Sequence, residues 1–413
     1  MFSNQQNTIK SRNQIDQKAF LFGLISVFLS GIGFTIVSPV IPFLVQPYIS
    51  NPANQALAVT ALTSVYAVCV FLAAPGLGAL SDRFGRRVVL LICLLGSTIG
   101  YLVFGLGGAL WILFLGRIIE GFTGGTIGTI FAYFSDITPA EERTKYFGWI
   151  SAVTGVGVVF GPTIGGLLAN FGYAIPMFAG AFVTFLNFLF GYFFMPESLA
   201  KESRLTAVPV SRLNPFTQLK NILSIKQVSR LLFAGFLLWI PNGAFQAVFS
   251  QFTIDSFHWQ PTVIGLVFSI IGIQDIFSQS LIMPRLLKWL TDRQIVTLGM
   301  SAEIVGYVLI ACSTIFHQPS LFIIGMFIFG FGDSIFGPAF NGLLSKAVTQ
   351  QEQGRVQGGS QAIQSLARVI GPLIGGQLYV SLGHSAPAVM GIFLIFCAIA
   401  VMYQTIQTVI VKH

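Results

Sequence analysis

The segment Gly161–Gly166 reads Gly-Pro-Thr-Ile-Gly-Gly, and 210 positions later Gly371–Gly376 reads Gly-Pro-Leu-Ile-Gly-Gly. Both segments lie inside long apolar runs, where membrane helices tolerate glycine and proline that would break a soluble helix. At the same offset, Ser81–Arg83 aligns with Thr291–Arg293. Several matches at one shared offset predict that the chain consists of two similar halves.

Apolar stretches of about 20 residues, which is enough to cross a bilayer, recur along the whole chain. We predict spans near 19–45, 57–80, 88–107, 110–133, 147–169, 174–195, 229–254, 262–287, 294–313, 321–346, 358–381 and 385–409. The composition agrees, because 54% of the residues are hydrophobic and 9% are charged, whereas soluble proteins contain about 25% charged residues. This composition excludes a soluble enzyme, a nucleic-acid-binding protein and a disordered protein.

The 22 Lys and Arg residues are distributed asymmetrically. All except Arg117 and Arg368 fall at the termini or in the loops that follow even-numbered spans. Positive loops stay on the cytoplasmic side of a membrane, which predicts that both termini are cytoplasmic. We therefore predict an all-α membrane protein with twelve transmembrane helices in two pseudo-symmetric six-helix bundles. Its parts are an N-terminal bundle at 1–197, a cytoplasmic linker at 198–228 and a C-terminal bundle at 229–413. The basic residues of the linker lie either on the inner leaflet or in solvent.

The four cysteines and four histidines show no metal or redox spacing. The cysteines lie inside the apolar runs and the histidines lie outside them, so the two residue types do not share one depth. An embedded enzyme would need a nucleophile–base pair or a metal cluster at one depth. We therefore predict no catalytic residue, no bound metal and no enzymatic activity.

The loop between spans 2 and 3 reads Gly-Ala-Leu-Ser-Asp-Arg-Phe-Gly-Arg-Arg over Gly78–Arg87. Its glycines allow a tight turn, Asp82 can cap a helix or form a salt bridge, and its arginines hold the loop inside. The loop resembles the signature loop of the major facilitator superfamily, whose two six-helix repeats bind substrate between them. In that family the loop latches the two halves together. The resemblance assigns this latch to Gly78, Asp82, Arg83, Gly85, Arg86 and Arg87.

Span 5 carries a regular series of small residues. Small residues let helices approach closely, and proline kinks a helix. The whole series, beginning at Gly148, resembles the motif of the drug:proton antiporters in this superfamily, which implies export. The resemblance assigns the antiporter motif to Gly157, Gly161, Pro162, Gly165 and Gly166.

Further segments are similar to the bacterial tetracycline:proton antiporters of that family. They are Arg117 with Glu120–Gly121, Ser135–Arg143, Pro196–Ser198, Gly299–Tyr307 and Gln353–Gly358. The chain departs from those antiporters at three positions. Ser30 and Gly100 stand where they carry acids in spans 1 and 3, and Asp275 stands where they carry a histidine in span 8. The acid of span 9 is kept as Glu303, so proton-coupled drug export is implied more firmly than tetracycline itself.

Six ionisable residues lie at membrane depth in the predicted spans, away from the span ends, and each costs about 2.5–3.5 kcal/mol at a helix centre. Acids outnumber bases among them, so some carboxyl groups have no fixed positive partner. Burial favours the neutral carboxyl group, and such a group can bind and release a proton. We predict that proton coupling uses Asp275 and Glu303 first, then Asp333, together with Arg117, Glu120 and Arg368. Arg117 and Glu120, three residues apart, equally suit a structural ion pair.

Polar residues recur at helical spacing in three spans of the second half. In span 11, Gln357, Gln361, Gln364 and Arg368 share one helical face. Such stripes either line a cavity or hold helices together. Because three neighbouring spans carry them, we predict a substrate cavity formed by Asn242, Gln246, Phe245, Gln274, Gln361 and Gln364.

These observations together predict a proton-coupled secondary transporter that exports drugs or other amphipathic compounds, with tetracycline as one candidate. The alternatives are a metabolite or sugar transporter of the same fold and, remotely, a membrane-embedded enzyme. We expect a monomer in the bacterial cytoplasmic membrane, in contact with lipid, a small-molecule substrate and protons, and without nucleic acid. No cofactor is expected beyond the proton gradient. A divalent cation bound to the substrate is retained as an alternative.

Overall fold

The computed structural model describes residues 17–138, 142–206, 213–216, 226–348 and 353–410. Within these ranges the regular structure is helical, without strands. The first half contains α2 (Gln17–Ile36), α3 (Ile41–Val45), α4 (Pro52–Phe84), α5 (Arg86–Leu106), α6 (Leu110–Phe122), α7 (Thr126–Ile137), α8 (Arg143–Leu168) and α9 (Ile175–Phe194). The second half contains α11 (Lys226–Phe257), α12 (Pro261–Phe277), α13 (Met283–Trp289), α14 (Asp292–Phe316), α15 (Pro319–Lys346), α16 (Gln353–Leu382) and α17 (Ala386–Ile410).

Each of the twelve predicted spans coincides with one helix or with helices in series. By length and apolar composition alone, nine of the described helices could cross a membrane, or ten if the bent pair α2–α3 counts as one span. Two predicted spans fall outside this count. The break at 123–125 divides span 4 into α6 and α7, each too short to cross alone. Helix α16 is 30 residues long, but its glutamines lower its hydropathy.

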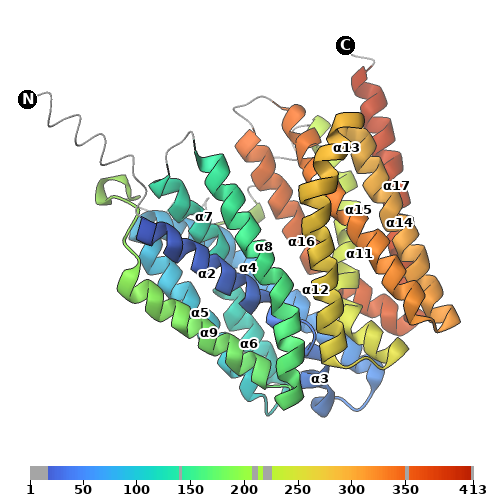
Figure 1. Cartoon of the computed structure of the whole chain (residues 1–413), viewed down its shortest axis with the longest axis horizontal. Coiled ribbons are helices and arrows are strands. Elements are labelled where there is room, and N and C mark those ends of the chain that lie inside the picture. Colours follow the sequence, from blue (N-terminus) through green and yellow to red (C-terminus); the bar gives the residue numbers. More distant parts are fainter. Residues whose placement is uncertain (1–16, 139–141, 207–212, 217–225, 349–352, 411–413) are drawn as a thin grey trace, which may run out of the picture.

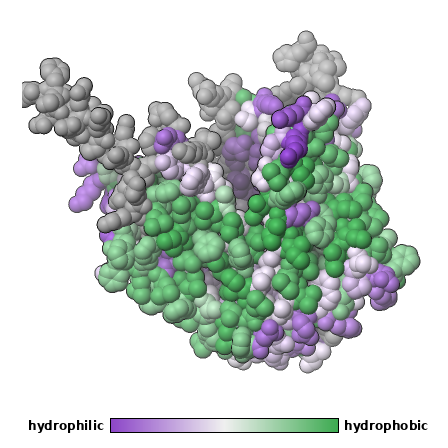
Figure 2. Space-filling model, in the orientation of Figure 1, coloured by the Kyte–Doolittle hydropathy of each residue, from purple (hydrophilic) through white to green (hydrophobic). Residues whose placement is uncertain are grey.

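On the face shown in Figure 2, apolar residues cover the middle of the molecule, and hydrophilic residues gather above and below them. Large apolar side chains are exposed on helices of both halves, among them Phe193 of α9, Ile273 of α12 and Phe393 of α17. A soluble monomer rarely exposes contiguous apolar surface on this scale. The chain is therefore a multi-pass membrane protein.

Separate apolar clusters lie inside the two halves. In the first half, one cluster includes Ile36 and Phe104, and another includes Leu90 and Phe134. The second half has one large cluster, which Phe43 and two other first-half residues also join. The boundaries at 197/198 and 228/229 stay predictions, and the linker positions 207–212 and 217–225 lie outside the described residues.

The repeated glycine–proline segment has the same packing role in both halves. In α8, a Cβ atom on Gly165 would lie 2.0 Å from the Ile36 carbonyl oxygen of α2. A Cβ atom on the adjacent Gly166 would lie 2.4 Å from the Pro261 carbonyl oxygen of α12, in the other half. Only glycine permits both backbone approaches. Gly165 of α8 therefore packs against a helix of its own half, and Gly166 packs against a helix of the other half.

Helix α16 repeats this arrangement. A Cβ atom on Gly375 would lie 2.7 Å from the Ala244 Cβ of α11, within the same half. A Cβ atom on Gly376 would lie 2.1 Å from the Thr60 hydroxyl oxygen of α4, in the first half. The sequence repeat is thus a structural repeat, and each copy forms one contact across the interface.

The two halves are joined on the side of the molecule away from the termini. Hydrogen bonds across this contact, which we call the outer seal, include Thr262 Oγ1 to the Gly166 oxygen (3.0 Å), Thr163 Oγ1 to the Gly265 oxygen (3.3 Å) and Ser250 Oγ to the Ser38 oxygen (2.9 Å). Nearer the middle of the helices, Ser64 Oγ donates to the Val369 oxygen at 3.3 Å. The first turn of α2 and the last turn of α17 lie on the opposite side (Figure 1). A cavity of about 270 Å³ lies between the later part of α4 and the earlier part of α16, lined by Phe71 and Gln361 among others. The molecule is therefore sealed on the far side and opens toward its termini.

Candidate functional site

A cavity of about 440 Å³ lies among the helices of the second half. It brings together seven of the residues that the sequence predicts for substrate binding or proton coupling: Asn242, Phe245, Gln246, Asp275, Asp333, Gln364 and Arg368. Its other walls are mainly aromatic, including Trp239, Phe268 and Phe329. A pocket with apolar walls and a few polar groups is typical of a small-molecule site.

This cavity continues toward the first half. An adjoining space of about 330 Å³ shares Gln246 and Arg368 with it and adds Phe34 and Tyr66 from α2 and α4. A further space of about 190 Å³ shares Phe34, Tyr66 and Gln246 and extends to Arg117. We call these three connected spaces the central cavity. Both halves contribute to it: the first adds the rings of Phe34 and Tyr66, and the second supplies most of the aromatic rings together with the carboxyl and amide groups.

Two acids of the central cavity each accept a hydrogen bond from a side-chain amide. Asn242 Nδ2 donates to Asp333 Oδ1 at 3.2 Å, and Gln279 Nε2 donates to Asp275 Oδ1 at 2.9 Å. The hydroxyl of Tyr307 donates to Asn242 Oδ1 at 2.9 Å. Hydrogen bonds from neutral donors stabilise an ionised carboxylate. Each of these two acids therefore has one amide donor and lies open to the central cavity.

Glu303 differs from these two acids. Its residue is 0% exposed, and neither carboxyl oxygen has a hydrogen-bond partner within the described part of the chain. An isolated charge in such a place is strongly unfavourable. Glu303 is therefore buried and does not line the central cavity. The sequence had predicted it, together with Asp275, as a first candidate for proton coupling.

Arg117 and Glu120 form a buried ion pair, with Arg117 Nη1 2.8 Å from Glu120 Oε2. The guanidinium of Arg117 also lies over the ring of Phe104, 4.9 Å from its centroid. The ion pair that the i,i+3 spacing allows is therefore present, and the role of both residues in proton coupling stays a prediction. Arg117 nevertheless reaches the edge of the central cavity, so the pair sits beside the substrate volume of the first half.

Two predicted cavity residues lie elsewhere. Gln274 turns toward α15 and donates to the Phe327 carbonyl oxygen at 2.6 Å. Adjacent residues on a helix point about 100° apart, so Gln274 and Asp275 cannot share one direction. Gln361 lines the separate 270 Å³ cavity on the termini side. The polar stripe on α16 therefore reaches the central cavity at Gln364 and Arg368, nearer the membrane centre.

Tyr307 was not predicted as a site residue, although its hydroxyl bonds the predicted Asn242. Gln279 belongs to the polar group that the sequence places around Asp275, but it was not among the predicted cavity residues. Tyr307 follows Glu303 by four residues, and Gln279 follows Asp275 by four. A helix turn brings such pairs to one face. This spacing is a signal that could have identified both residues.

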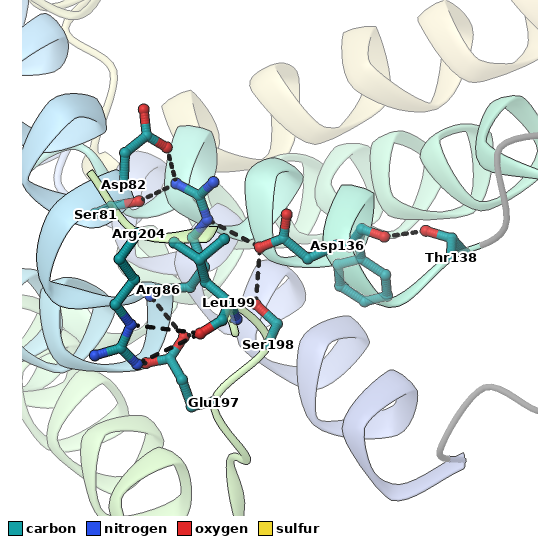
Figure 3. Close-up of polar contacts among 10 residues, drawn as sticks. Ser81, Asp82, Arg86, Asp136, Thr138, Glu197, Ser198, Leu199 and Arg204 are labelled. Atoms are coloured by element: carbon teal, nitrogen blue, oxygen red, sulfur yellow. Dashed lines mark hydrogen bonds and ion pairs between the residues drawn. The ribbon is translucent and has the colours of Figure 1, made fainter. Parts of the chain in front are cut away.

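The predicted latch loop forms a polar network around Arg86 (Figure 3). Its Nη1 lies 2.5 Å from Asp82 Oδ1 and donates to Ser81 Oγ at 2.6 Å. Its Nε donates to Asp136 Oδ2 at 3.0 Å, and its backbone amide donates to Glu197 Oε1 at 2.8 Å. The planar guanidinium suits such a fork of acceptors. Arg86 therefore ties the ends of α4, α7 and α9 together.

The other latch residues surround this network. Gly85 has a φ of +101°, and a Cβ atom there would lie 2.2 Å from Glu197 Oε2. Arg83 lies over the ring of Phe84, and Arg87 Nη2 donates to the Tyr192 oxygen at 2.5 Å. A Cβ atom on Gly78 would meet nothing within 4 Å. The contacts named here lie within the first half and the start of the linker, so they do not bridge the two halves.

Comparisons with known proteins test the resemblance drawn from the sequence motifs. A family model described as Major Facilitator Superfamily matches residues 23–358 and 231–408. Tetracycline resistance protein, class C, of Escherichia coli is 36% identical over 356 residues, which cover 86% of this chain and 88% of that protein. Tetracycline resistance protein, class H, of Pasteurella multocida is 30% identical over 366 residues, 88% of this chain and 89% of that protein. The resemblance drawn from the motifs is confirmed.

A third relative and a solved structure extend the comparison. Multidrug resistance protein 2 of Bacillus subtilis (strain 168) is 28% identical over 384 residues, 91% of this chain and 90% of that protein. The crystal structure of a D-xylose-proton symporter aligns with a TM-score of 0.73 at 15% identity. The alignment covers 93% of this chain and 97% of that one. The likeness confirms the predicted fold class.

Proposed function

The chain belongs to the Major Facilitator Superfamily, and from that premise we propose that it exports amphipathic drugs in exchange for protons. Tetracycline heads the candidate substrates, because the relatives named above include two tetracycline resistance proteins. The single observation that carries the proposal is the central cavity, which joins aromatic side chains of one half to carboxylates of the other. Family membership places the chain among transporters and not among enzymes.

The orientation follows from the distribution of charge. Positive loops favour the cytoplasm, so we assign the termini side to the cytoplasm of a bacterial cell. In this conformation the central cavity then opens toward the cytoplasm, and we call this opening its mouth. The outer seal closes the external side. Alternating access would open that seal and close the mouth, so that substrate bound inside is released outside.

The lining of the cavity favours a drug over a sugar. Phe34 and Tyr66 on one side and Phe268 on the other offer flat apolar surface, which suits a large planar molecule. A sugar or polar metabolite would bury less apolar surface against these rings. Asp275 and Asp333 supply negative charge for the cationic part of an amphipathic substrate.

Competition at these carboxylates would couple the two fluxes. A substrate with a cationic group favours the ionised acids, and a proton removes the charge that attracts it. Each binding event therefore disfavours the other, which is the thermodynamic requirement for exchange. Arg368 lines the same space, and its charge would hold the acids ionised until substrate arrives. This scheme needs no cofactor beyond the proton gradient, and we propose that a monomer in lipid suffices.

Uptake into everted membrane vesicles, energised by a proton gradient, tests the proposal. Tetracycline, a fluoroquinolone and a lipophilic cation would be compared, with magnesium present or chelated to detect a co-transported cation. We expect gradient-driven uptake of at least one compound, and its loss with an uncoupler and in Asp333→Asn and Asp275→Asn. Glu202→Gln, an exposed linker acid, is the matched control and should transport normally. Uptake that persists without a gradient, or in both aspartate variants, would refute proton exchange at this site.

A further inference from the structure

Glu303 and Asp333 form a pair of carboxyl groups with unequal surroundings. Glu303 lies on α14 and Asp333 on α15, where a Cβ atom on the adjacent Gly332 would lie 3.0 Å from Glu303 Cγ. Asn242 of α11 donates to Asp333, and neither Glu303 oxygen has a hydrogen-bond partner within the described residues. Asp333 is exposed to the central cavity, whereas Glu303 is fully buried. Two neighbouring carboxyl groups in a site of low dielectric do not both ionise readily. The surroundings must therefore decide which one carries the charge.

The amide of Asn242 has a direction, and Tyr307 sets it. The Tyr307 hydroxyl donates to Asn242 Oδ1, which leaves the NH₂ group of Asn242 to face Asp333. An amide nitrogen can only donate, so this orientation stabilises an ionised Asp333. In the flipped orientation the amide nitrogen would donate to the Tyr307 hydroxyl, whose own proton would lose Asn242 Oδ1 as its acceptor. The amide oxygen would then face Asp333, and only a protonated acid could donate to it. The orientation of Asn242 is thus linked to the protonation of Asp333.

The surroundings of Tyr307 hold its hydroxyl in place. Its residue is 0% exposed, and its ring packs edge-on against Phe245 and Phe329 at centroid distances of 5.8 and 5.0 Å. Such ring contacts restrict the side chain. Tyr307 therefore holds the Asn242 amide in position, and that amide in turn donates to Asp333.

We propose that Asn242, oriented by Tyr307, is the positioning residue that makes Asp333 the ionised, cavity-facing proton acceptor and leaves Glu303 protonated. The inference rests on the proposed proton exchange and assigns different tasks to its two acids. Asp333 would exchange protons with the cavity in this conformation, and Glu303 would hold its proton until the helices move. The other charged groups that influence Asp333 are Asp275 on α12 and Arg368 on α16, and they are present in every variant below.

Infrared difference spectroscopy on the purified full-length protein, titrated with pH and without substrate, tests this assignment. The carbonyl stretch of a protonated carboxyl group reports each acid directly, and Asp333→Asn and Glu303→Gln identify the two bands. We expect the Asp333 band to titrate in wild type and the Glu303 band to persist at higher pH. Asn242→Leu should move the Asp333 midpoint upward by about one pH unit, because a hydrogen bond to a charged group is lost.

Tyr307→Phe keeps the ring and removes only the hydroxyl, so it tests the same contact even if Asn242→Leu fails to fold. We expect a smaller upward shift of the Asp333 midpoint in this variant. Tyr379→Phe is the matched control, because its hydroxyl bonds Asp255 outside the cavity, at 2.7 Å, and should leave the midpoint unchanged. An Asp333 midpoint that stays at the wild-type pH in both Asn242→Leu and Tyr307→Phe would overturn the inference. Ionisation of Glu303 before Asp333 would also overturn it. Vesicle uptake tests proton exchange separately, so the two failures are distinguishable.

Discussion

Replacement of Gly166 by alanine should weaken the outer seal. The added Cβ atom would lie 2.4 Å from the Pro261 carbonyl oxygen and 3.0 Å from the Thr262 Cα atom, both in the backbone of the opposite half. Ordinary contact begins at 3.4 Å, so α8 and α12 must separate locally by about 1 Å. Neither neighbour is a flexible side chain that can turn away. The substitution therefore acts on the contact between the halves.

The magnitude follows from the cost of overpacking. An extra methyl group in a well-packed interface costs about 1–3 kcal/mol. The strain exists only while the seal is closed, so the conformational equilibrium should shift toward the externally open state by about 5- to 150-fold. Alanine also favours helix by up to about 1 kcal/mol over glycine, but that gain is present in both states and does not affect their ratio.

A cysteine at Thr63 would report this shift, because Thr63 lines the central cavity. In a background without the four native cysteines, a membrane-impermeant thiol reagent would be added to the outside of intact cells. We expect Gly166→Ala to increase the labelling rate at least several-fold. Gly148→Ala is the matched control on the same helix, because its Cβ atom would meet nothing within 4 Å. Equal labelling rates in the two variants would refute the role assigned to this contact.

Three further substitutions test other parts of the structure. Gly78→Leu should fold normally, because the position is open here, but should slow vesicle uptake if the mouth closes over this loop. Normal uptake would contradict that closure. Arg117→Leu leaves the buried Glu120 without its partner and should lower the free energy of unfolding by about 3–5 kcal/mol. Thermal melting in detergent measures this loss, and Arg117→Leu/Glu120→Gln should recover part of it. Gly85→Ala combines a positive φ with a clash against Glu197 and should destabilise by at least about 1–2 kcal/mol. A melting temperature equal to that of wild type would show that the loop relaxes.

Local spacing predicted those contacts that depend on one helix or one loop. Arg117 and Glu120 pair because three residues span one helix turn, and this pairing needs no tertiary information. The glycine–proline repeat predicted two equivalent halves for a similar reason, since close helix packing requires small residues wherever it occurs. What the repeat could not show was the partner of each glycine. Gly165 and Gly166 are neighbours in sequence, but they face different halves of the molecule.

The candidate site depended more strongly on the tertiary structure. Asp275, Glu303 and Asp333 lie on three helices, and periodicity shows the face that each occupies but not the helix that covers that face. The sequence ranked Asp275 and Glu303 ahead of Asp333, but it could not predict the different surroundings of the three acids. Asp275 and Asp333 face the cavity with an amide donor each, and Glu303 is enclosed.

The sequence by itself determined that this protein crosses a membrane many times, in two repeated halves, with buried acids in the second half. Those properties follow from hydropathy, charge and helical spacing, which act locally along the chain. Only the tertiary structure decided which side of the interface is sealed, which glutamines reach the cavity and which acid is open to it. These outcomes depend on contacts between helices far apart in sequence, and the free energy of a buried charge is set by the neighbours that such contacts bring.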